Sequence, residues 1–179
     1  MEVLTNMSRV WAMPNSNTFL IPPIRGFITE YFDKTKDKGG WVYDPFVKDS
    51  PFKSRCITND IDPDIKADYN LDALDFLVGL PSCSAKIVLF DPPYSPRQVS
   101  ECYKKLDRTV NMQTTQSSFW SKLKKEIARI VQPGGYVLSF GWNSGGIGKK
   151  AGFEIVEIML VAHGGWHNDT ICTAEKEIK

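Results

Sequence analysis

The sequence has few of the residues from which disulfide frameworks and metal sites are built. Its 179 residues include four cysteines and two histidines. The cysteines lie far apart, at Cys56, Cys83, Cys102 and Cys172. Without a Cys-x-x-Cys pair they are expected to be unpaired thiols of a reducing compartment. His163 and His167 flank a Gly-Gly loop without a nearby cysteine or carboxylate pair at ligand spacing, so no metal site is predicted.

The chain also lacks a long apolar run and an excess of either charge. No apolar stretch approaches the ~20 residues of a membrane-spanning helix. The N-terminus has no basic stretch followed by an apolar one, as a signal peptide would have. We therefore expect a cytoplasmic protein. The formal net charge is +1, and a protein that held nucleic acid by overall charge would be far more basic, so any such binding must depend on a local patch.

The composition is that of an ordinary folded domain. Hydrophobic residues make up 42% of the chain and charged residues 24%, and the length is enough to bury a core without disulfides or metals. No internal repeat or low-complexity tract is present, so we predict one domain over residues 1–179. Residues 1–40 are expected to be a lead-in segment packed on that domain, extended at first and helical over about 24–32.

Apolar patterns predict strands that alternate with helices. The expected strands lie at 41–43, 56–59, 86–90, 136–140, 153–162 and 170–174. The expected helices lie at 72–80 and 118–131, with a weaker helical pattern at 143–151. Such alternation predicts an α/β fold with a mostly parallel sheet, and the last two strands, joined by a loop alone, predict a C-terminal antiparallel strand. Too few residues separate the first strands for full crossover helices, so the first half must be abbreviated.

The clearest chemistry follows the 86–90 strand, where Asp91-Pro92-Pro93-Tyr94 ends it. Proline cannot continue a central strand, so the prolines fix a stiff turn at the edge of the sheet. Methylation of an aromatic amine requires acceptors aimed at its N–H bonds, because its lone pair is delocalised into the ring. An Asp carboxylate and a proline carbonyl can supply these acceptors, and Tyr94 offers a stacking face. The plainer reading is an Asp-Pro turn, which needs neither the second proline nor the aromatic ring.

Acidic residues also follow the earlier predicted strands. Asp44 and Asp60 come at the ends of the first two strands, and Asp91 comes at the end of the third. In open parallel sheets, ligands bind beyond the carboxyl ends of the strands. We therefore expect the functional side chains to gather at one edge of the sheet.

Asp-Pro-Pro-Tyr after an apolar strand resembles the motif of DNA methyltransferases that modify N6 of adenine or N4 of cytosine, a motif that some RNA guanine N2-methyltransferases share. The longer string from Phe90 to Gln98 is similar to small phage-type N6-adenine methyltransferases, and the resemblance extends from about Trp11 to the end of the chain. It implies a Rossmann-like fold, S-adenosyl-L-methionine as cofactor, and methyl transfer to adenine N6 in DNA, in a bacterial or phage-infected cell. The catalytic residues would be Asp91, Pro92, Pro93 and Tyr94.

The resemblance also implies a cofactor site. Its residues would be Trp11, Pro23, Asp44, Pro45, Phe46, Asp60, Asp72 and Ala73. In the family, the Asp-Pro-Phe motif lies against the methionine end of the cofactor, and an acid in the place of Asp60 accepts hydrogen bonds from the ribose. Two plainer readings stay open: Asp72 as a helix N-cap, and Trp11 as a core residue.

The substrate side is implied by two further segments. The residues expected to contact substrate are Ser95, Arg97, Phe140, Trp142 and Asn143. The basic loop 95–116 either contacts phosphates or is simply a solvated, charge-rich segment. No stretch is long enough for a separate recognition domain, so specificity must come from this loop, from a homo-oligomer partner or from another protein.

One departure from the family lies after Asp44, where the segment 45–52 contains no glycine. Glycines normally let the backbone approach a ligand closely. Two alternatives therefore stand beside the DNA adenine reading: an RNA base amino-methyltransferase, and a non-catalytic binding protein on a degenerate methyltransferase fold. The absence of a Pro-Cys dipeptide argues against attack on C5 of cytosine.

Overall fold

In the computed structural model, the described residues are 5–93 and 117–179, so Tyr94, Ser95, Arg97 and the rest of the loop 95–116 lie outside them. The described residues form one seven-stranded sheet in the order β1-β6-β7-β5-β4-β2-β3. The strands are β1 (Asn6–Trp11), β2 (Trp41–Asp44), β3 (Ile57–Thr58), β4 (Ala85–Phe90), β5 (Val131–Gly141), β6 (Phe153–Ala162) and β7 (Thr170–Glu177). β7 pairs antiparallel with both neighbours, and the other pairings are parallel, as the sequence predicts.

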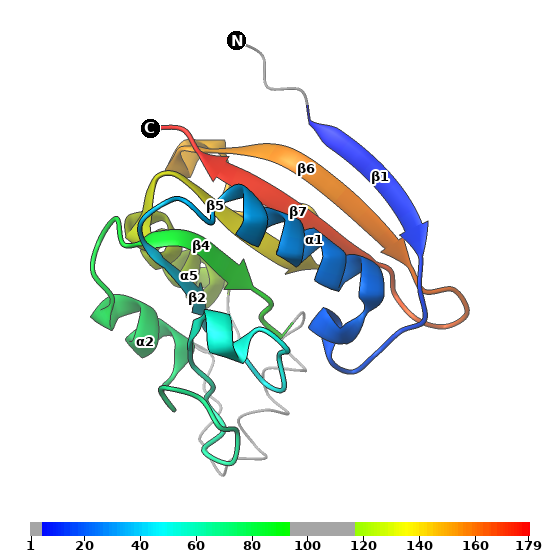
Figure 1. The fold of residues 1–179 in the computed structure, drawn as a ribbon, viewed down its shortest axis with the longest axis horizontal. Helices are drawn as coiled ribbons and strands as arrows, with labels where there is room; N and C mark the ends of the chain where they lie inside the picture. Colours follow the sequence, from blue (N-terminus) through cyan, green and yellow to red (C-terminus); the bar gives the residue numbers. More distant parts are fainter. Residues whose placement is uncertain (1–4, 94–116) are drawn as a thin grey trace.

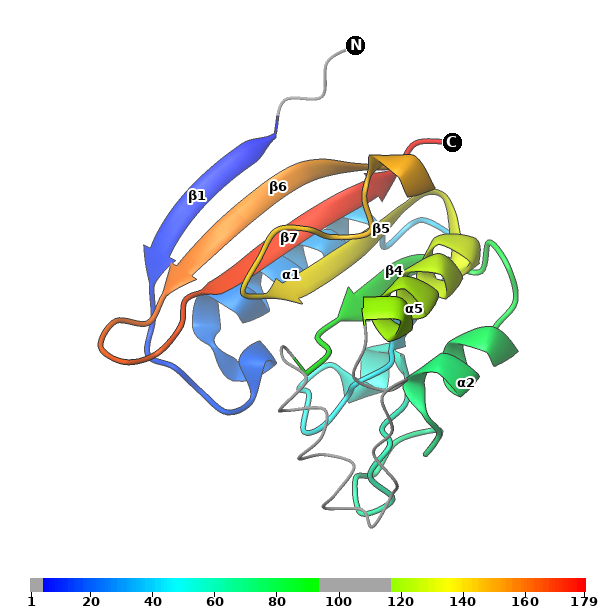
Figure 2. The same ribbon diagram turned by 180° about the vertical axis from the view of Figure 1, so that it is seen from behind.

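Helices cover both faces of the sheet. They are α1 (Pro22–Lys34), α2 (Ala73–Gly79) and α5 (Ser117–Ile130). α1 lies across one face (Figure 1), and α5 lies across the opposite face over β4 and β5 (Figure 2). On α5, Leu123, Ile127 and Ile130 recur at helical spacing and are fully buried. None of the helices described is long and apolar enough to cross a membrane.

The first half of the sheet is abbreviated, as predicted. Only a short 3-10 turn, Lys53–Arg55, lies between β2 and β3, and β3 has two residues. Beyond β3, the next strand is reduced to a single bridge between Asn59 and Tyr69. The connection from β2 to β3 therefore contains no α-helix that could cover the carboxyl end of β2.

The N-terminal segment differs from the prediction. Rather than only an extended lead-in, residues Asn6–Trp11 form a strand that pairs parallel with β6 at the edge of the sheet. Its side chains are almost all exposed, so the sequence carries no in–out alternation from which a strand would be recognised. Backbone hydrogen bonds to β6 hold this strand in place, and such bonds do not depend on which side chains the strand carries.

The predicted helix at 143–151 is wrong, because only the 3-10 turn Lys149–Ala151 is helical. The buried Glu175 carboxylate of β7 accepts hydrogen bonds from the backbone N–H groups of Ile147 (2.5 Å) and Gly148 (2.8 Å). Gly146 has a φ of +39°, and a side chain there would meet the same carboxylate. A distant acid thus holds this segment as a loop. β5 also begins at Val131, immediately after α5 and five residues earlier than predicted.

Arg129 joins the two helices of one face. Its guanidinium donates to the backbone carbonyls of Leu77 (2.9 Å) and Leu80 (2.9 Å), at the end of α2, and to the Glu126 carboxylate (2.7 Å). The last carbonyls of a helix have no partner within the helix. Arg129 supplies that partner from α5 and so positions α2, whose N-terminal end borders the site described below.

We predict that Arg129→Ala lowers the free energy of unfolding by about 2 kcal/mol, since it removes several charge-assisted hydrogen bonds. For a chain of this size the melting temperature should fall by roughly 4–8 °C. Thermal unfolding followed by circular dichroism measures this change. Lys125→Ala, on an exposed position of the same helix, is the matched control and should change stability by less than about 0.5 kcal/mol. Equal effects of the two substitutions would contradict the role given to Arg129.

Candidate active site at the carboxyl ends of the strands

The chain reverses direction across the sheet between β2 and β4. From β2 it passes to β3 on one side, then crosses back to β4 on the other. Ligands of open α/β sheets bind in the crevice that such a reversal leaves at the carboxyl ends of the strands. Asp44 ends β2, Asp91 follows β4 and Asp60 follows β3, and all three carboxylates are buried. The structure therefore brings together three of the acids predicted from the sequence.

Asp44 has the most unusual environment of the three. Its Oδ1 accepts a hydrogen bond from the Phe46 N–H (3.2 Å). Its Oδ2 is buried without a hydrogen-bond partner in the described part of the chain. Burial, together with the negative charges of Asp91 and Asp60, raises the pKa of Asp44 to about 8, although the Phe46 N–H and the charge of Lys48 oppose the rise. A buried carboxyl with one oxygen unpartnered and two acids beside it is suited to receiving a cationic group.

Asp60 and Asp72 already make local hydrogen bonds. Asp60 accepts from the backbone N–H groups of Lys48 (2.9 Å) and Asp62 (3.0 Å). Asp72 is the N-cap of α2 and accepts from the Leu74 N–H (2.9 Å), so the plainer reading of this residue is correct. A carboxylate has about four acceptor sites, so these bonds leave room for further donors. Neither contact excludes a role toward a ligand.

A small cavity of about 80 Å³, called the β3 cavity here, lies beside these acids. Among its lining residues are Pro45, Phe46, Asp60, Asp72 and Ala73, five of the eight residues predicted to bind a cofactor. Phe119 and Trp120 from α5 complete its wall. The cavity therefore combines apolar surfaces with two carboxylates, the surroundings that suit a heteroaromatic ring joined to a hydroxylated sugar.

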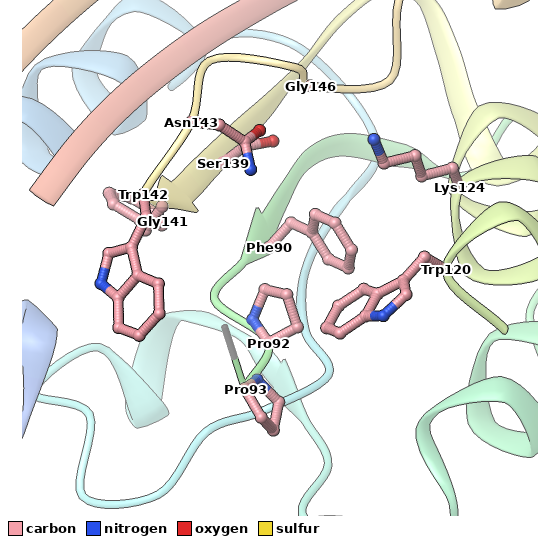
Figure 3. A pocket seen from close by; sticks show the side chains of 11 residues that line it. Phe90, Pro92, Pro93, Trp120, Lys124, Ser139, Gly141, Trp142, Asn143 and Gly146 are labelled. Atoms are coloured by element: carbon pink, nitrogen blue, oxygen red, sulfur yellow. The ribbon is translucent and has the colours of Figure 1, made fainter. Parts of the chain in front are cut away.

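A larger cavity of about 250 Å³, the β5 cavity, lies on the other side of the Asp91 turn. Phe140, Trp142 and Asn143 line it, as predicted for the substrate side. Figure 3 shows the Trp120 ring from α5 and the Trp142 ring from the end of β5 on opposite sides of Pro92. Pro92, Pro93 and Trp120 line both cavities. The proline turn is thus the wall that the two cavities share.

Three predicted cofactor residues, Asp44, Trp11 and Pro23, line neither cavity. Trp11 is exposed at the end of β1, five strand positions from β2, which is roughly 24 Å at ~4.8 Å per strand. The exposure also rules out the alternative that Trp11 packs in the core. Pro23 lies in the first turn of α1. For Trp11 the reason is the pairing of β1 with β6, which places the start of the chain at the far edge of the sheet.

The glycine-free segment after β2 is accommodated by Lys48. This residue has a φ of +42°, in the left-handed region that glycine normally occupies. The hydrogen bond from its N–H to Asp60 holds the loop in this conformation. The loop therefore turns sharply without a glycine, at the expense of backbone strain at Lys48.

Several lining residues were not among the site residues predicted from the sequence, among them Lys48, Trp120, Lys124 and Ser139. Trp120 belongs to an amphipathic helix whose apolar residues the periodicity assigns to the core, although the neighbouring pair Phe119-Trp120 at its start is a signal that could have been noticed. Ser139 lies within an apolar strand, and nothing in its local sequence marks it.

His163 has a structural role. Its Nδ1 lies 2.9 Å from the Ala12 carbonyl and its Nε2 lies 2.9 Å from the Thr170 hydroxyl. These contacts tie the end of β6 to the chain after β1. Within residues 5–93 and 117–179 there is no group of three His, Cys, Asp or Glu side chains that would hold a metal ion.

The sheet order and the helices on both faces define a Rossmann-like fold of the S-adenosylmethionine-dependent methyltransferase type. No family model and no curated protein matches the chain. Among solved structures, TrmN from Thermus thermophilus is similar with a TM-score of 0.55 and 14% identity, over 88% of this chain and 49% of that one. The chain thus spans about half the length of TrmN.

Two shorter proteins are similar over almost their whole length. The N-methyltransferase NodS from Bradyrhizobium japonicum WM9 has a TM-score of 0.54 and 10% identity, over 88% of this chain and 98% of that one. A candidate methylase from Haemophilus influenzae has a TM-score of 0.54 and 9% identity, over 86% of this chain and 98% of that one. At these identities the likeness establishes the fold.

We predict that Asp44→Asn stabilises the ligand-free protein at alkaline pH. The pKa of Asp44 is raised from 3.8 to about 8, so the folded state holds a proton that the unfolded chain has released. This contribution to stability is fully present below about pH 4 and is lost as the pH rises through about 8. Asparagine resembles the neutral form at every pH. The variant should therefore gain more than about 1 kcal/mol at pH 9, or roughly 2–4 °C in melting temperature.

Thermal unfolding at about pH 5 and pH 9 tests this expectation. Asp49→Asn, at an exposed carboxylate, is the control and should leave the pH dependence unchanged. If Asp44→Asn melted with the same pH dependence as the unaltered protein, Asp44 would not carry the raised pKa.

Proposed function

We propose that this protein transfers the methyl group of S-adenosyl-L-methionine to the exocyclic amino group of a nucleobase, with N6 of adenine in DNA as the target. The observation that carries the proposal is the position of the Asp91-Pro92-Pro93 turn. Its two prolines line both cavities, one of which is otherwise lined by residues predicted to bind the cofactor and the other by residues predicted to contact the substrate. A group-transfer enzyme has to bring its two substrates together at such a point.

The β3 cavity suits the adenosine end of the cofactor. Phe46 and Ala73 offer apolar surfaces for the adenine ring, and Asp60 and Asp72 offer acceptors for ribose hydroxyls and for the adenine amino group. A cavity of about 80 Å³ holds only part of such a ligand, because whole-ligand pockets are usually ~300 Å³ or more. NodS has also been solved in complex with S-adenosyl-l-homocysteine, with a TM-score of 0.50 and 9% identity to this chain.

The unsatisfied oxygen of Asp44 supports a cationic cofactor. S-adenosylmethionine carries a positive sulfonium and a positive α-ammonium group. A cation beside Asp44 would supply the missing countercharge and lower the pKa of its carboxyl. When bound, the cofactor supplies an electrophilic methyl group. The three buried acids favour that cation through their combined negative charge.

The β5 cavity suits an extruded base. Trp120 and Trp142 offer ring faces on either side of the turn, and aromatic faces stack on any nucleobase. With the base rotated out of its helix, the Asp91 carboxylate and the Pro92 carbonyl accept hydrogen bonds from its amino group. Their pull would restore lone-pair density on the nitrogen, so that it could take the methyl group in line as the methyl–sulfur bond of the cofactor breaks. S-adenosylhomocysteine would leave, and the proton displaced from the nitrogen would pass to solvent. Positioning is the main catalytic contribution, and no covalent intermediate with the protein is needed.

Contact with the nucleic-acid backbone is assigned to a local patch, because the net charge is only +1. The Lys124 side chain extends from α5 at the β5 cavity (Figure 3) and can meet a phosphate next to the extruded base. Tyr94, Ser95 and Arg97 are proposed to add stacking and phosphate contacts. Specificity for a target sequence would come from the loop 95–116, from a second copy of the chain or from another protein.

The proposal is tested by supplying labelled S-adenosylmethionine with DNA or RNA and digesting the product to nucleosides. We expect label in N6-methyldeoxyadenosine from DNA. Label in N2-methylguanosine from RNA would overturn both the base and the polymer. No transfer, together with no cofactor binding by calorimetry, would leave the non-catalytic binding protein as the better description.

We further predict that Asp91→Ala reduces methyl transfer at least about 100-fold, as the loss of one preorganised hydrogen-bonding group typically does. Its cofactor affinity, measured by calorimetry, should remain within a few-fold of that of the unaltered protein. Asp75→Ala, at an exposed acid of α2, is the control and should keep full activity. Full activity in Asp91→Ala would place the reacting nitrogen elsewhere.

A further inference from the structure

Two hydroxyl groups are buried in the sheet without a hydrogen-bond partner among the described residues. They belong to Ser139 on β5 and Thr173 on β7. The two residues face each other in the antiparallel register of these strands, so they lie on the same face of the sheet. An unpaired buried hydroxyl costs free energy and is uncommon in native proteins. Each of them therefore requires an explanation.

The two hydroxyls differ in what they face. Ser139 lines the β5 cavity, whereas Thr173 is not among the residues that line it. Ser139 is 9% exposed and Thr173 is fully buried. The Ser139 side chain therefore borders the β5 cavity. Its hydroxyl oxygen is itself buried, and a rotation about the Cα–Cβ bond can turn it toward a ligand in the cavity, which would supply its missing partner. The hydroxyl of Thr173, on the next strand, has no such access.

Ser139 also lies close to the reacting position. It pairs with Phe90 in the register of β4 and β5, and Asp91 is the next residue after Phe90. Neighbouring strands lie ~4.8 Å apart, so the backbone of Ser139 lies within about one to two strand spacings of the Asp91 turn. A base whose amino group is held at Asp91 would present its ring edge to Ser139.

We propose that Ser139 is a specificity-determining residue whose hydroxyl donates a hydrogen bond to a ring nitrogen beside the amino-bearing carbon of the target base. This inference rests on the function proposed above and deepens it. In adenine, N1 is bonded to that carbon, N7 stands on the other side of the amino group, and both nitrogens are acceptors. In guanine, the ring nitrogen next to the amino-bearing carbon on the pairing edge carries a hydrogen, so it cannot accept. A hydroxyl aimed at the ring nitrogen on the pairing edge thus favours adenine and cytosine over guanine, whose acceptor N3 lies on the other side of the amino group.

Ser139→Ala and Thr173→Val form a matched pair, because each removes one unpaired buried hydroxyl. For Ser139→Ala we expect kcat/KM for methyl transfer to DNA to fall about 10- to 100-fold, the usual effect of losing one substrate hydrogen bond. Calorimetry should show unchanged cofactor affinity. The melting temperature of the ligand-free variant should be equal or higher, because an unsatisfied group has been removed. Thr173→Val should keep full activity.

Base analogues give a second, independent readout. DNA in which the target adenine is replaced by its 1-deaza or 7-deaza analogue lacks one of the two ring acceptors. With the unaltered protein, one of the two analogues should lower kcat/KM by a factor similar to that of Ser139→Ala. With Ser139→Ala, that same analogue should cause no further loss.

The outcomes separate the two proposals. If the unaltered protein methylates DNA and Ser139→Ala does so equally well, the role of Ser139 is wrong and the proposed function stands. If both analogues affect the two proteins to the same extent, the role of Ser139 is likewise wrong. If the unaltered protein transfers no methyl group to DNA or RNA, the proposed function fails and the role of Ser139 fails with it. A loss of cofactor binding or of folding in Ser139→Ala would indicate a structural role.

Discussion

The site depends on the position at which one buried strand has to end. β4 lies between β2 and β5 in the middle of the sheet, and Asp91-Pro92-Pro93 stops it because proline cannot continue the hydrogen-bonded ladder. The stop falls where the chain reverses direction across the sheet, so the turn projects into the crevice rather than over a helix. Both cavities take their shared wall from these prolines. If the strand ran further, it would fill the space where the two ligands are proposed to meet.

Around this turn the protein gathers negative charge instead of neutralising it. Asp44, Asp60 and Asp91 come from three different strand ends and are all buried. In the ligand-free protein, the repulsion is relieved by the raised pKa of Asp44, which favours its neutral form. The strained φ of Lys48 has a related cause, because that conformation directs its N–H to Asp60. Backbone strain and an unfavourable charge distribution thus occur together where a cationic ligand is expected, as is common at functional sites.

Much of the fold could be predicted because the elements that frame the site have strong local signals. Each of these signals is contained in a short stretch of neighbouring residues. They are the burial periodicity of α1 and α5, the apolar run of β4 and the short β2–β3 connection. β1 and the 143–148 loop could not be predicted in this way. β1 is held by backbone pairing at an exposed edge, and the loop is held by Glu175, which lies nearly thirty residues later in the chain. Neither constraint can be inferred from the neighbouring residues in the sequence.

The same division applies to the site. By itself, the sequence determined the Asp-Pro-Pro turn and the acids at the strand ends, because proline stereochemistry and strand termination are local properties of the chain. Only the tertiary structure decided that Trp120 borders both cavities, that Trp11 lies at the far edge, and that the Ser139 hydroxyl is unpaired beside the β5 cavity. Burial and the lack of a hydrogen-bond partner arise from the packing of segments that are distant in the sequence. They are decided when β4, β5 and α5 come together.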